Sequence, residues 1–212
     1  HKKYQYPILF TQDDVVSAMS RFVPVEYDTE VDIGDGIMAK WHNAGHILGS
    51  AFIEIHVDGQ RIVFSGDIGN EDAPILKDTA PLPEHDILVI ESTYGDRLHE
   101  TKDESEHKLL GLITEAANKG GAIMMPAFSI ERAQEMLYRL DHFSEQDKTL
   151  PDMPVYLDSP MAIKVVDVFK KFPAYYDQEA CKQYMNGDDF LDFPGLEMTE
   201  TKEQSKAINR VP

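Results

Sequence analysis

Cysteine is almost absent from this chain, since Cys181 is the only one among 212 residues. A single cysteine excludes an internal disulfide framework and a zinc site built from thiolates. Long apolar runs are also missing, because no stretch reaches the roughly 18 residues that a membrane-spanning helix needs. The first residues lack the basic and apolar segments of a signal peptide. We therefore expect a cytoplasmic protein with no membrane partner.

Basic side chains are scarce, with 20 Lys and Arg against 38 Asp and Glu and a formal net charge of −18. A long polyanion is usually bound through clustered Lys and Arg, so this balance argues against a large nucleic-acid footprint. It does not exclude phosphodiester chemistry, because bound metal cations can make one cleft locally positive. The chain is long enough for one large domain or two smaller ones.

The first half of the chain predicts one helix followed by strands. A capping-box pattern at residues 11–14 predicts a helix that runs to about residue 22. The apolar run at residues 87–90 is typical of a strand that is buried on both faces. Asp58-Gly59 predicts a two-residue hairpin turn, and the other predicted strands lie at residues 37–42, 51–57 and 60–65.

The second half alternates helices and strands, which is typical of a parallel sheet covered by helices. Ser129 is expected to cap the second of these helices. The change of pattern places a domain boundary between residues 97 and 98. The predicted helices lie at residues 101–119, 129–143, from Pro160 onward and at 199–209, and the predicted strands at residues 122–128 and 155–157.

Three polar motifs follow the predicted strands of the first half. They are residues 45–51 (GHILGSA), residues 65–69 (SGDIG) and residues 91–95 (ESTYG), and they carry His46, Asp67 and Glu91 in that order. Neutral imidazole and carboxylate oxygen both bind Zn²⁺ well, and a carboxylate can bridge two ions. The pattern therefore points to a hydrolytic metal site.

These motifs, with residues 126–135 (PAFSIERAQE) and 157–162 (LDSPMA), resemble those of RNA-processing nucleases with a metallo-β-lactamase fold and an inserted β-CASP domain. The resemblance implies an α/β protein. Residues 1–97 would form part of a metallo-β-lactamase αββα sandwich, and residues 98–212 part of a β-CASP domain with a parallel sheet flanked by helices. The family's His-x-His-x-Asp-His signature and its two later histidine motifs are absent, which implies a central segment of a longer enzyme.

The resemblance also implies roles for single residues. His46 and Asp67 would bind metal, with Asp67 bridging two zinc ions of the complete enzyme. Glu91 would act in catalysis with Asp67 by orienting a histidine from outside this chain. Substrate phosphate would be bound by Ser129, Arg132 and Ser159, although helix caps and a surface charge explain these three equally well.

The implied function is zinc-dependent cleavage of single-stranded RNA, as an endonuclease or an exonuclease, and a homo-oligomer is compatible with it. Two alternatives stay open: a hydrolase of a small ester or phosphodiester with the same fold, and an inactive scaffold subunit of an RNA-processing complex. Because this chain holds only two of the direct metal ligands, we expect the segment alone to bind zinc weakly and to lack nuclease activity.

Overall fold

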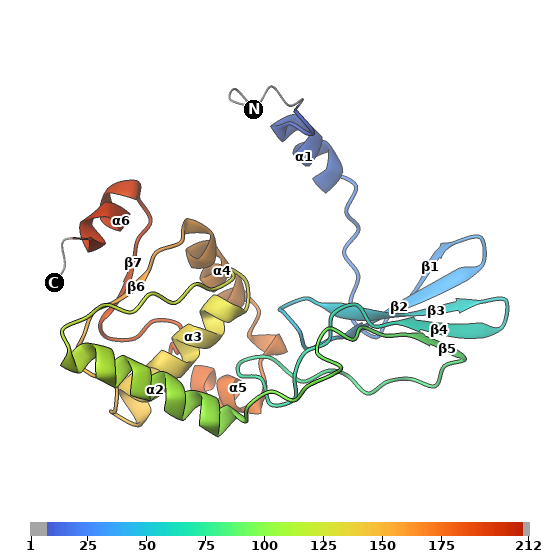
Figure 1. Ribbon diagram of the computed structural model, residues 1–212. Coiled ribbons are helices and arrows are strands. Elements are labelled where there is room, and N and C mark those ends of the chain that lie inside the picture. Colours follow the sequence, from blue (N-terminus) through green and yellow to red (C-terminus); the bar gives the residue numbers. More distant parts are fainter. Residues whose placement is uncertain (1–7, 210–212) are drawn as a thin grey trace.

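The computed structural model describes residues 8–209, which form two lobes and one detached helix (Figure 1). The β-lobe comprises residues 27–91, and the helical lobe comprises residues 101–208. Helix α1 (Gln12–Met19) stands away from both lobes at the end of an extended segment (Figure 1). Thr11 caps it with the predicted capping box, yet none of its residues is buried. No helix within residues 8–209 is both long and apolar enough to cross a membrane.

The β-lobe is built on one five-stranded sheet in which the strands follow one another in sequence order. All neighbouring strands are antiparallel except the last pair, which is parallel. Asp58 and Gly59 join two of them with φ values of 50° and 77°, so the predicted hairpin turn is confirmed. The strands are β1 (Glu30–Gly34), β2 (Ile37–Asn43), β3 (Ala51–Val57), β4 (Gln60–Phe64) and β5 (Ile87–Val89).

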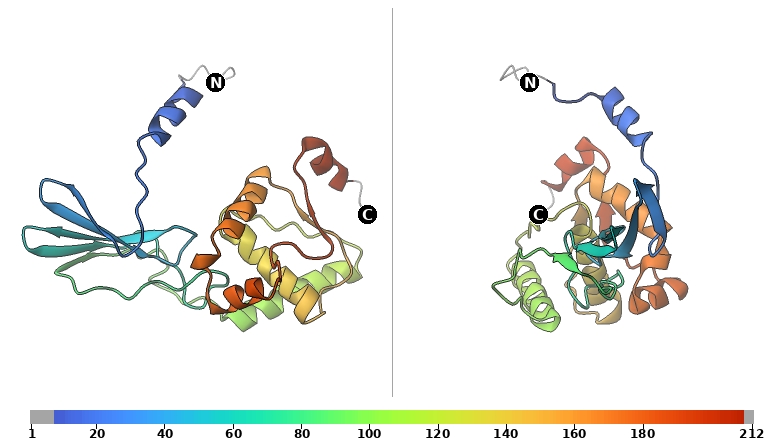
Figure 2. Two further views of the ribbon diagram at one scale, coloured as in Figure 1. Left: turned by 180° about the vertical axis from the view of Figure 1, so that it is seen from behind. Right: turned by 90° about the vertical axis from the view of Figure 1, so that its right-hand side faces the viewer.

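Strand β5 was predicted to be buried on both faces, and this is wrong for the described residues. It is the edge strand of the sheet, and Ile87 and Val89 are 43% and 50% exposed. The helices of residues 8–209 lie beside the sheet and cover neither of its faces (Figure 2). An apolar run shows that a strand can be buried, but a second layer must be present to bury it.

The helical lobe holds most of the helices and a two-stranded parallel sheet. Its core includes Leu137, Val166, Phe169, Tyr176 and Leu191. The elements are α2 (Lys102–Asn118), α3 (Arg132–Asp141) with a π-helical turn at His142–Gln146, β6 (Val155–Leu157), α4 (Pro160–Lys171), a 3-10 turn at Pro173–Tyr175, α5 (Gln178–Met185), β7 (Leu196–Met198) and α6 (Lys202–Ile208). Strands β6 and β7 are the parallel pair, and α5 and β7 were not predicted.

Two predictions for the helical lobe are wrong. Residues 122–128 form no strand, and Met124 and Phe128 are 89% and 84% exposed. Their apolar composition is suited to a strand, but no described strand pairs with them. Ser129 does not cap α3, because that helix begins later and its N-cap residue is Glu131. Thr101 and Ser159, by contrast, cap α2 and α4 through hydroxyl acceptors.

The two lobes meet through a loop that follows β4. Ile75 and Leu76 in this loop are buried in the core of the helical lobe, although they precede the predicted boundary between residues 97 and 98. Leu76 forms a β-bridge with Tyr176, and the backbone N–H of Asp177 donates to the carbonyl of Ile75 at 2.7 Å. The position of the domain boundary stays a prediction, but residues from both sides of it pack into one core.

Candidate active site

Two glycine-containing loops at the end of the sheet carry His46 and Asp67. They touch closely, since the N–H of Gly69 donates to the carbonyl of Ala44 at 2.9 Å. A Cβ atom on Gly69 would lie 1.9 Å from the carbonyl oxygen of Gly45, and one on Gly45 would lie 2.6 Å from the backbone nitrogen of Thr79. Only glycine fits at both positions, so these residues determine how close the two loops can come.

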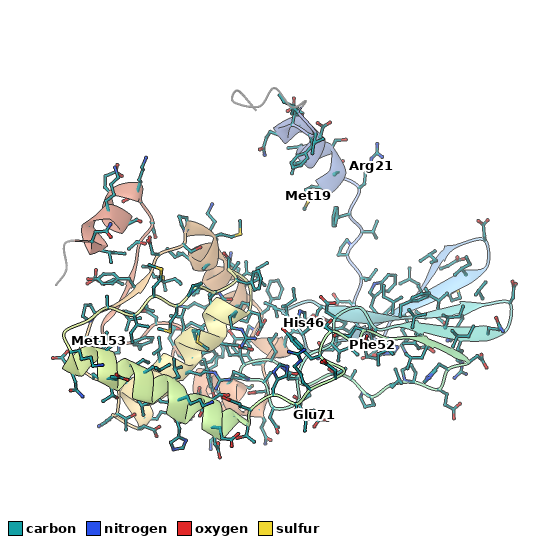
Figure 3. The ribbon with its side chains drawn as sticks, in the orientation of Figure 1. Met19, Arg21, His46, Phe52, Glu71 and Met153 are labelled. Carbon is teal, nitrogen blue, oxygen red and sulfur yellow. The ribbon has the colours of Figure 1, made fainter. Side chains whose placement is uncertain are left out.

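This approach brings the two predicted metal ligands together. His46 Nε2 and Asp67 Oδ2 are 3.9 Å apart, and both side chains are accessible, at 44% and 75% exposure. Figure 3 shows His46 where the two lobes meet. Two bonds of roughly 2.0–2.2 Å that meet at one zinc ion at a tetrahedral angle separate their donor atoms by about 3.4 Å. The donor types suit one metal ion, and the 3.9 Å between these two atoms is about 0.5 Å wider than a shared tetrahedral ion requires.

The pair does not make a complete site by itself. A zinc ion usually has about four ligands. Among residues 8–209, no group of three or more His, Cys, Asp or Glu side chains is arranged to hold a metal ion. His46 and Asp67 therefore fit as a partial ligand set.

Ser50 shapes the loop that carries His46, and the motif analysis assigned it no role. Its hydroxyl accepts from the N–H of His46 at 3.2 Å and from that of Ile47 at 3.1 Å. These two N–H groups lie on either side of the Cα atom of His46, so the Ser50 hydroxyl fixes the backbone from which the imidazole extends.

Glu91 lies beside Asp67 and is bonded to the same loop. Its Oε1 accepts from the N–H of Ile68 at 2.7 Å, and its own N–H donates to the hydroxyl of Ser65 at 3.0 Å. The Ile68 N–H, then a hydrogen bond from Thr93 and, more weakly, the charge of His46 hold the pKa of Glu91 below its ordinary value. The side chain is therefore a carboxylate that restrains the residue next to Asp67.

The three predicted substrate-binding residues lie in the helical lobe. The hydroxyls of Ser129 and Ser159 are 3.5 Å apart, so the fold brings these two residues together. Ser159 also accepts from the N–H of Ala162 at 3.2 Å as the cap of α4. Arg132 is 57% exposed and pairs with Glu135 at 2.6 Å. Its guanidinium has five N–H donors, so this pair leaves donors free for a further anion.

Glu131 and Glu135 were not singled out from the sequence, and both are buried at 7% exposure. Burial, with the charge of Glu135, raises the pKa of Glu131 to about 8. Burial likewise raises the pKa of Glu135, against the opposing charges of Arg132 and Arg139. Buried carboxyl groups with raised pKa values are enriched at functional sites. Both lie within the motif at residues 126–135, which was the available signal.

A cavity of about 600 Å³ lies elsewhere, at the far end of the β-lobe. It is lined by Gly59, Arg61 and residues 82–86, next to the hairpin turn between β3 and β4. The loops with His46 and Asp67 leave the opposite ends of these strands. The cavity is therefore separate from the candidate active site.

Comparisons with known proteins agree with the motifs. A family model described as the Beta-Casp domain matches residues 133–212. The chain is 36% identical over 203 residues to Ribonuclease TTHA0252 of Thermus thermophilus, which covers 96% of this chain and 46% of that protein. It is 34% identical over 169 residues to Endoribonuclease YSH1 of Candida glabrata, covering 77% of this chain and 22% of that protein.

A third relative is archaeal. The chain is 31% identical over 215 residues to Transcription termination factor FttA of Methanocaldococcus jannaschii, covering 98% of this chain and 33% of that protein. The chain thus spans less than half the length of each of these three relatives.

Proposed function

We infer from the Beta-Casp match over residues 133–212 and from the similarity to a ribonuclease that this chain belongs to the β-CASP family of metallo-β-lactamase-fold proteins, and on this premise we propose that the complete protein hydrolyses RNA phosphodiester bonds at a metal site. The observation that carries the proposal is the meeting of His46 and Asp67 at the junction of the lobes, 3.9 Å apart and accessible. The names of the similar proteins, a ribonuclease and an endoribonuclease, support RNA as the substrate.

We assign zinc to this site, held by His46 and Asp67 together with ligands from parts of the complete protein outside these residues. Imidazole nitrogen and carboxylate oxygen are ordinary zinc ligands, and two ions would make Asp67 the bridging carboxylate. Bound zinc supplies a Lewis acid for phosphoryl oxygen and lowers the pKa of water towards ~7, so that hydroxide is available near neutral pH.

The chain's own residues supply orientation. Glu91 holds the Asp67 loop through the N–H of Ile68, and we propose that it also orients a histidine from outside this chain. On the helical lobe, Ser129, Ser159 and Arg132 would bind a phosphate of the RNA strand. Charge-assisted hydrogen bonds from a guanidinium to phosphate are among the stronger polar contacts, so a modest number of basic residues can suffice there.

Single-stranded RNA is the substrate that this arrangement favours. His46 lies where the two lobes meet (Figure 3), and the side chains of His46 and Asp67 are both accessible, as binding of a strand at this site requires. A hydrolase of small esters or phosphodiesters has no need of the helical lobe. An inactive scaffold has no need of an accessible His46–Asp67 pair.

The test uses the full-length protein and a labelled single-stranded RNA oligomer, with a small chromogenic phosphodiester as a second substrate. We expect Asp67→Ala to lower RNA cleavage by more than about 10²-fold, because it removes a proposed ligand of the metal that would supply the Lewis acid and the activated water. Asp167→Ala is the matched control, since Asp167 is exposed on α4 and belongs to none of the motifs. Unchanged RNA cleavage by the Asp67 variant would overturn the proposal, and cleavage of the small substrate alone would favour the small-molecule alternative.

A further inference from the structure

One hydrogen bond ties the His46 loop of the β-lobe directly to the helical lobe. The backbone N–H of Leu48 donates to Oε2 of Glu131 at 3.1 Å, across 83 positions of sequence. The acceptor is buried, at 7% exposure, so water does not replace it readily. Leu48 is only two residues from His46, and a shift of this bond would move the imidazole.

The bond completes the hydrogen bonding of the loop. The N–H groups of His46 and Ile47 are taken by Ser50 within the β-lobe. The N–H of Leu48 is the next along the chain, and its acceptor comes from the other lobe. The side chain of Leu48 also packs against the core of the helical lobe. One side of the loop is therefore held locally, and the other is held by the helical lobe.

The backbone of Glu131, whose side chain accepts the hydrogen bond from Leu48, is in an energetically unfavourable conformation. Its φ and ψ are 65° and −64°, outside the regions that L residues favour. Such conformations are energetically unfavourable and persist where the surroundings impose them, often at functional sites. Glycine would adopt this backbone more easily, but it could not offer an acceptor to Leu48.

We propose that Glu131 is a positioning residue, through which the helical lobe sets the place of the metal ligand His46 by holding the N–H of Leu48. This inference rests on the proposed metal-dependent function. It assigns no chemical step to Glu131, which touches neither the proposed metal ligands nor, by this assignment, the substrate.

The protonation state of the Glu131 carboxyl group determines which substitution preserves the hydrogen bond from Leu48. Glu131 is close to Glu135 and Arg132, and burial with the Glu135 charge raises its pKa to about 8. Near neutral pH the group is mostly uncharged, and its carbonyl oxygen can accept from Leu48. The amide of glutamine has the same shape and the same acceptor, so Glu131→Gln is the conservative variant.

The experiment compares Glu131→Gln, Glu131→Ala and Glu131→Gly in the full-length protein. Lys148→Gly is the matched control, because Lys148 also has a positive φ, of 53°, but lies in the loop after α3 and its π-helical turn. Three quantities are measured: the melting temperature, kcat and KM for an RNA oligomer, and hydrogen exchange in the peptide with residues 44–50 of the metal-free protein.

We expect Glu131→Gly to melt no lower than wild type, because glycine relieves the backbone. It should nevertheless lower kcat about 10-fold or more, as losses of orienting contacts around metal ligands do. Hydrogen exchange at residues 44–50 should be faster in the Gly and Ala variants. Glu131→Gln should restore slow exchange and a kcat within about 3-fold of wild type. Lys148→Gly should resemble wild type in its hydrogen exchange at residues 44–50 and in its kcat.

A purely structural role predicts the opposite ordering, in which activity follows the melting temperature and Gly performs best. That result, or unchanged exchange at residues 44–50 in the Gly variant, would overturn the inference. If the wild-type protein cleaves no RNA, the proposed function fails. Exchange and melting would still report whether Glu131 holds the loop.

Discussion

At the scale of single residues, a buried polar network occupies one face of the β-lobe sheet. Glu54 is 5% exposed and accepts from two histidines, with Oε2 2.9 Å from His42 Nε2 and Oε1 2.6 Å from His56 Nε2. The second nitrogen of His42 is 2.7 Å from Asp28 Oδ1. His42 and His56 match no predicted metal motif, and their hydrogen bonds give them a structural role instead.

This network predicts a pH-dependent stability. Burial by itself would raise the pKa of Glu54, but the hydrogen bonds and charges of His56 and His42 outweigh it and leave the pKa below its ordinary value of 4.5. The carboxylate therefore stabilises the fold above about pH 4.5, and this contribution is lost as the pH falls through the lowered folded-state pKa.

We expect Glu54→Gln to lower the free energy of unfolding at pH 7 by about 1–3 kcal/mol, the range for a lost charged hydrogen bond. The difference from wild type should shrink as the pH falls below about 4. Urea unfolding at a series of pH values measures it. Glu84→Gln is the control, because the Glu84 side chain is 97% exposed. A wild-type advantage over Glu54→Gln that grows in acid would contradict the assignment.

At the scale of elements, the close approach of two loops matters more than any single strand. Each loop leaves the sheet at the end of a strand, β2 for the His46 loop and β4 for the Asp67 loop. Gly45 and Gly69 permit the contact because a side chain on either would collide with backbone atoms. The arrangement of the site thus depends on Gly45 and Gly69, which have no side chains to take part in the proposed reaction.

Gly69→Ala is expected to separate the loops, because its Cβ would lie 1.9 Å from the carbonyl oxygen of Gly45. We expect a loss of about 1–3 kcal/mol in the free energy of unfolding, as for other overpacked sites, and a large loss of RNA cleavage by the full-length protein. Thermal unfolding and a cleavage assay measure the two effects.

Gly111→Ala provides the control for that variant. Gly111 lies within α2, and a Cβ atom there would meet nothing within 4 Å. Alanine should therefore stabilise the protein by about 0.5–1 kcal/mol and leave cleavage unchanged. If both variants had the same effect on cleavage, the close contact of the two loops would not be what organises the site.

At the scale of the whole molecule, contacts between the two lobes hold the parts of the candidate site together. Ile75 and Leu76 from the loop after β4 lie in the core of the helical lobe. Tyr27 packs edge-on against Tyr175 with ring centroids 5.7 Å apart. Glu131 adds the hydrogen bond to Leu48. The loops of the β-lobe are consequently held against the helical lobe on several sides.

The incomplete ligand set predicts the metal binding of this chain alone. We expect residues 1–212 to bind zinc weakly and to cleave no RNA oligomer, because His46 and Asp67 provide two of the roughly four ligands that a zinc site needs. Isothermal titration with zinc measures the affinity, and the full-length protein serves as the comparison. Two tight zinc sites on residues 1–212 would refute this expectation.

Local sequence patterns determined much of the secondary structure. The capping box at Thr11 and the Asp58-Gly59 turn each act within about four residues, so the sequence alone was enough to find them. The order of the polar motifs also indicated the family, and the Beta-Casp match over residues 133–212 and the similarity to a ribonuclease agree with it. The failures at residues 122–128 and on the faces of β5 concern burial and strand pairing, which require a partner far away in the sequence. The expected cap at Ser129 is wrong because α3 begins at Arg132, with Glu131 at a positive φ as its N-cap residue.

The sequence by itself determined which side chains could bind a metal, because ligand chemistry belongs to residue types and His46 and Asp67 could be found by reading along the chain. Only the tertiary structure decided that His46 and Asp67 lie 3.9 Å apart. It also decided that Glu131 of the helical lobe accepts a hydrogen bond from Leu48 in the His46 loop. The physical reason is that these relations depend on close packing between segments up to 83 residues apart, which no local pattern encodes.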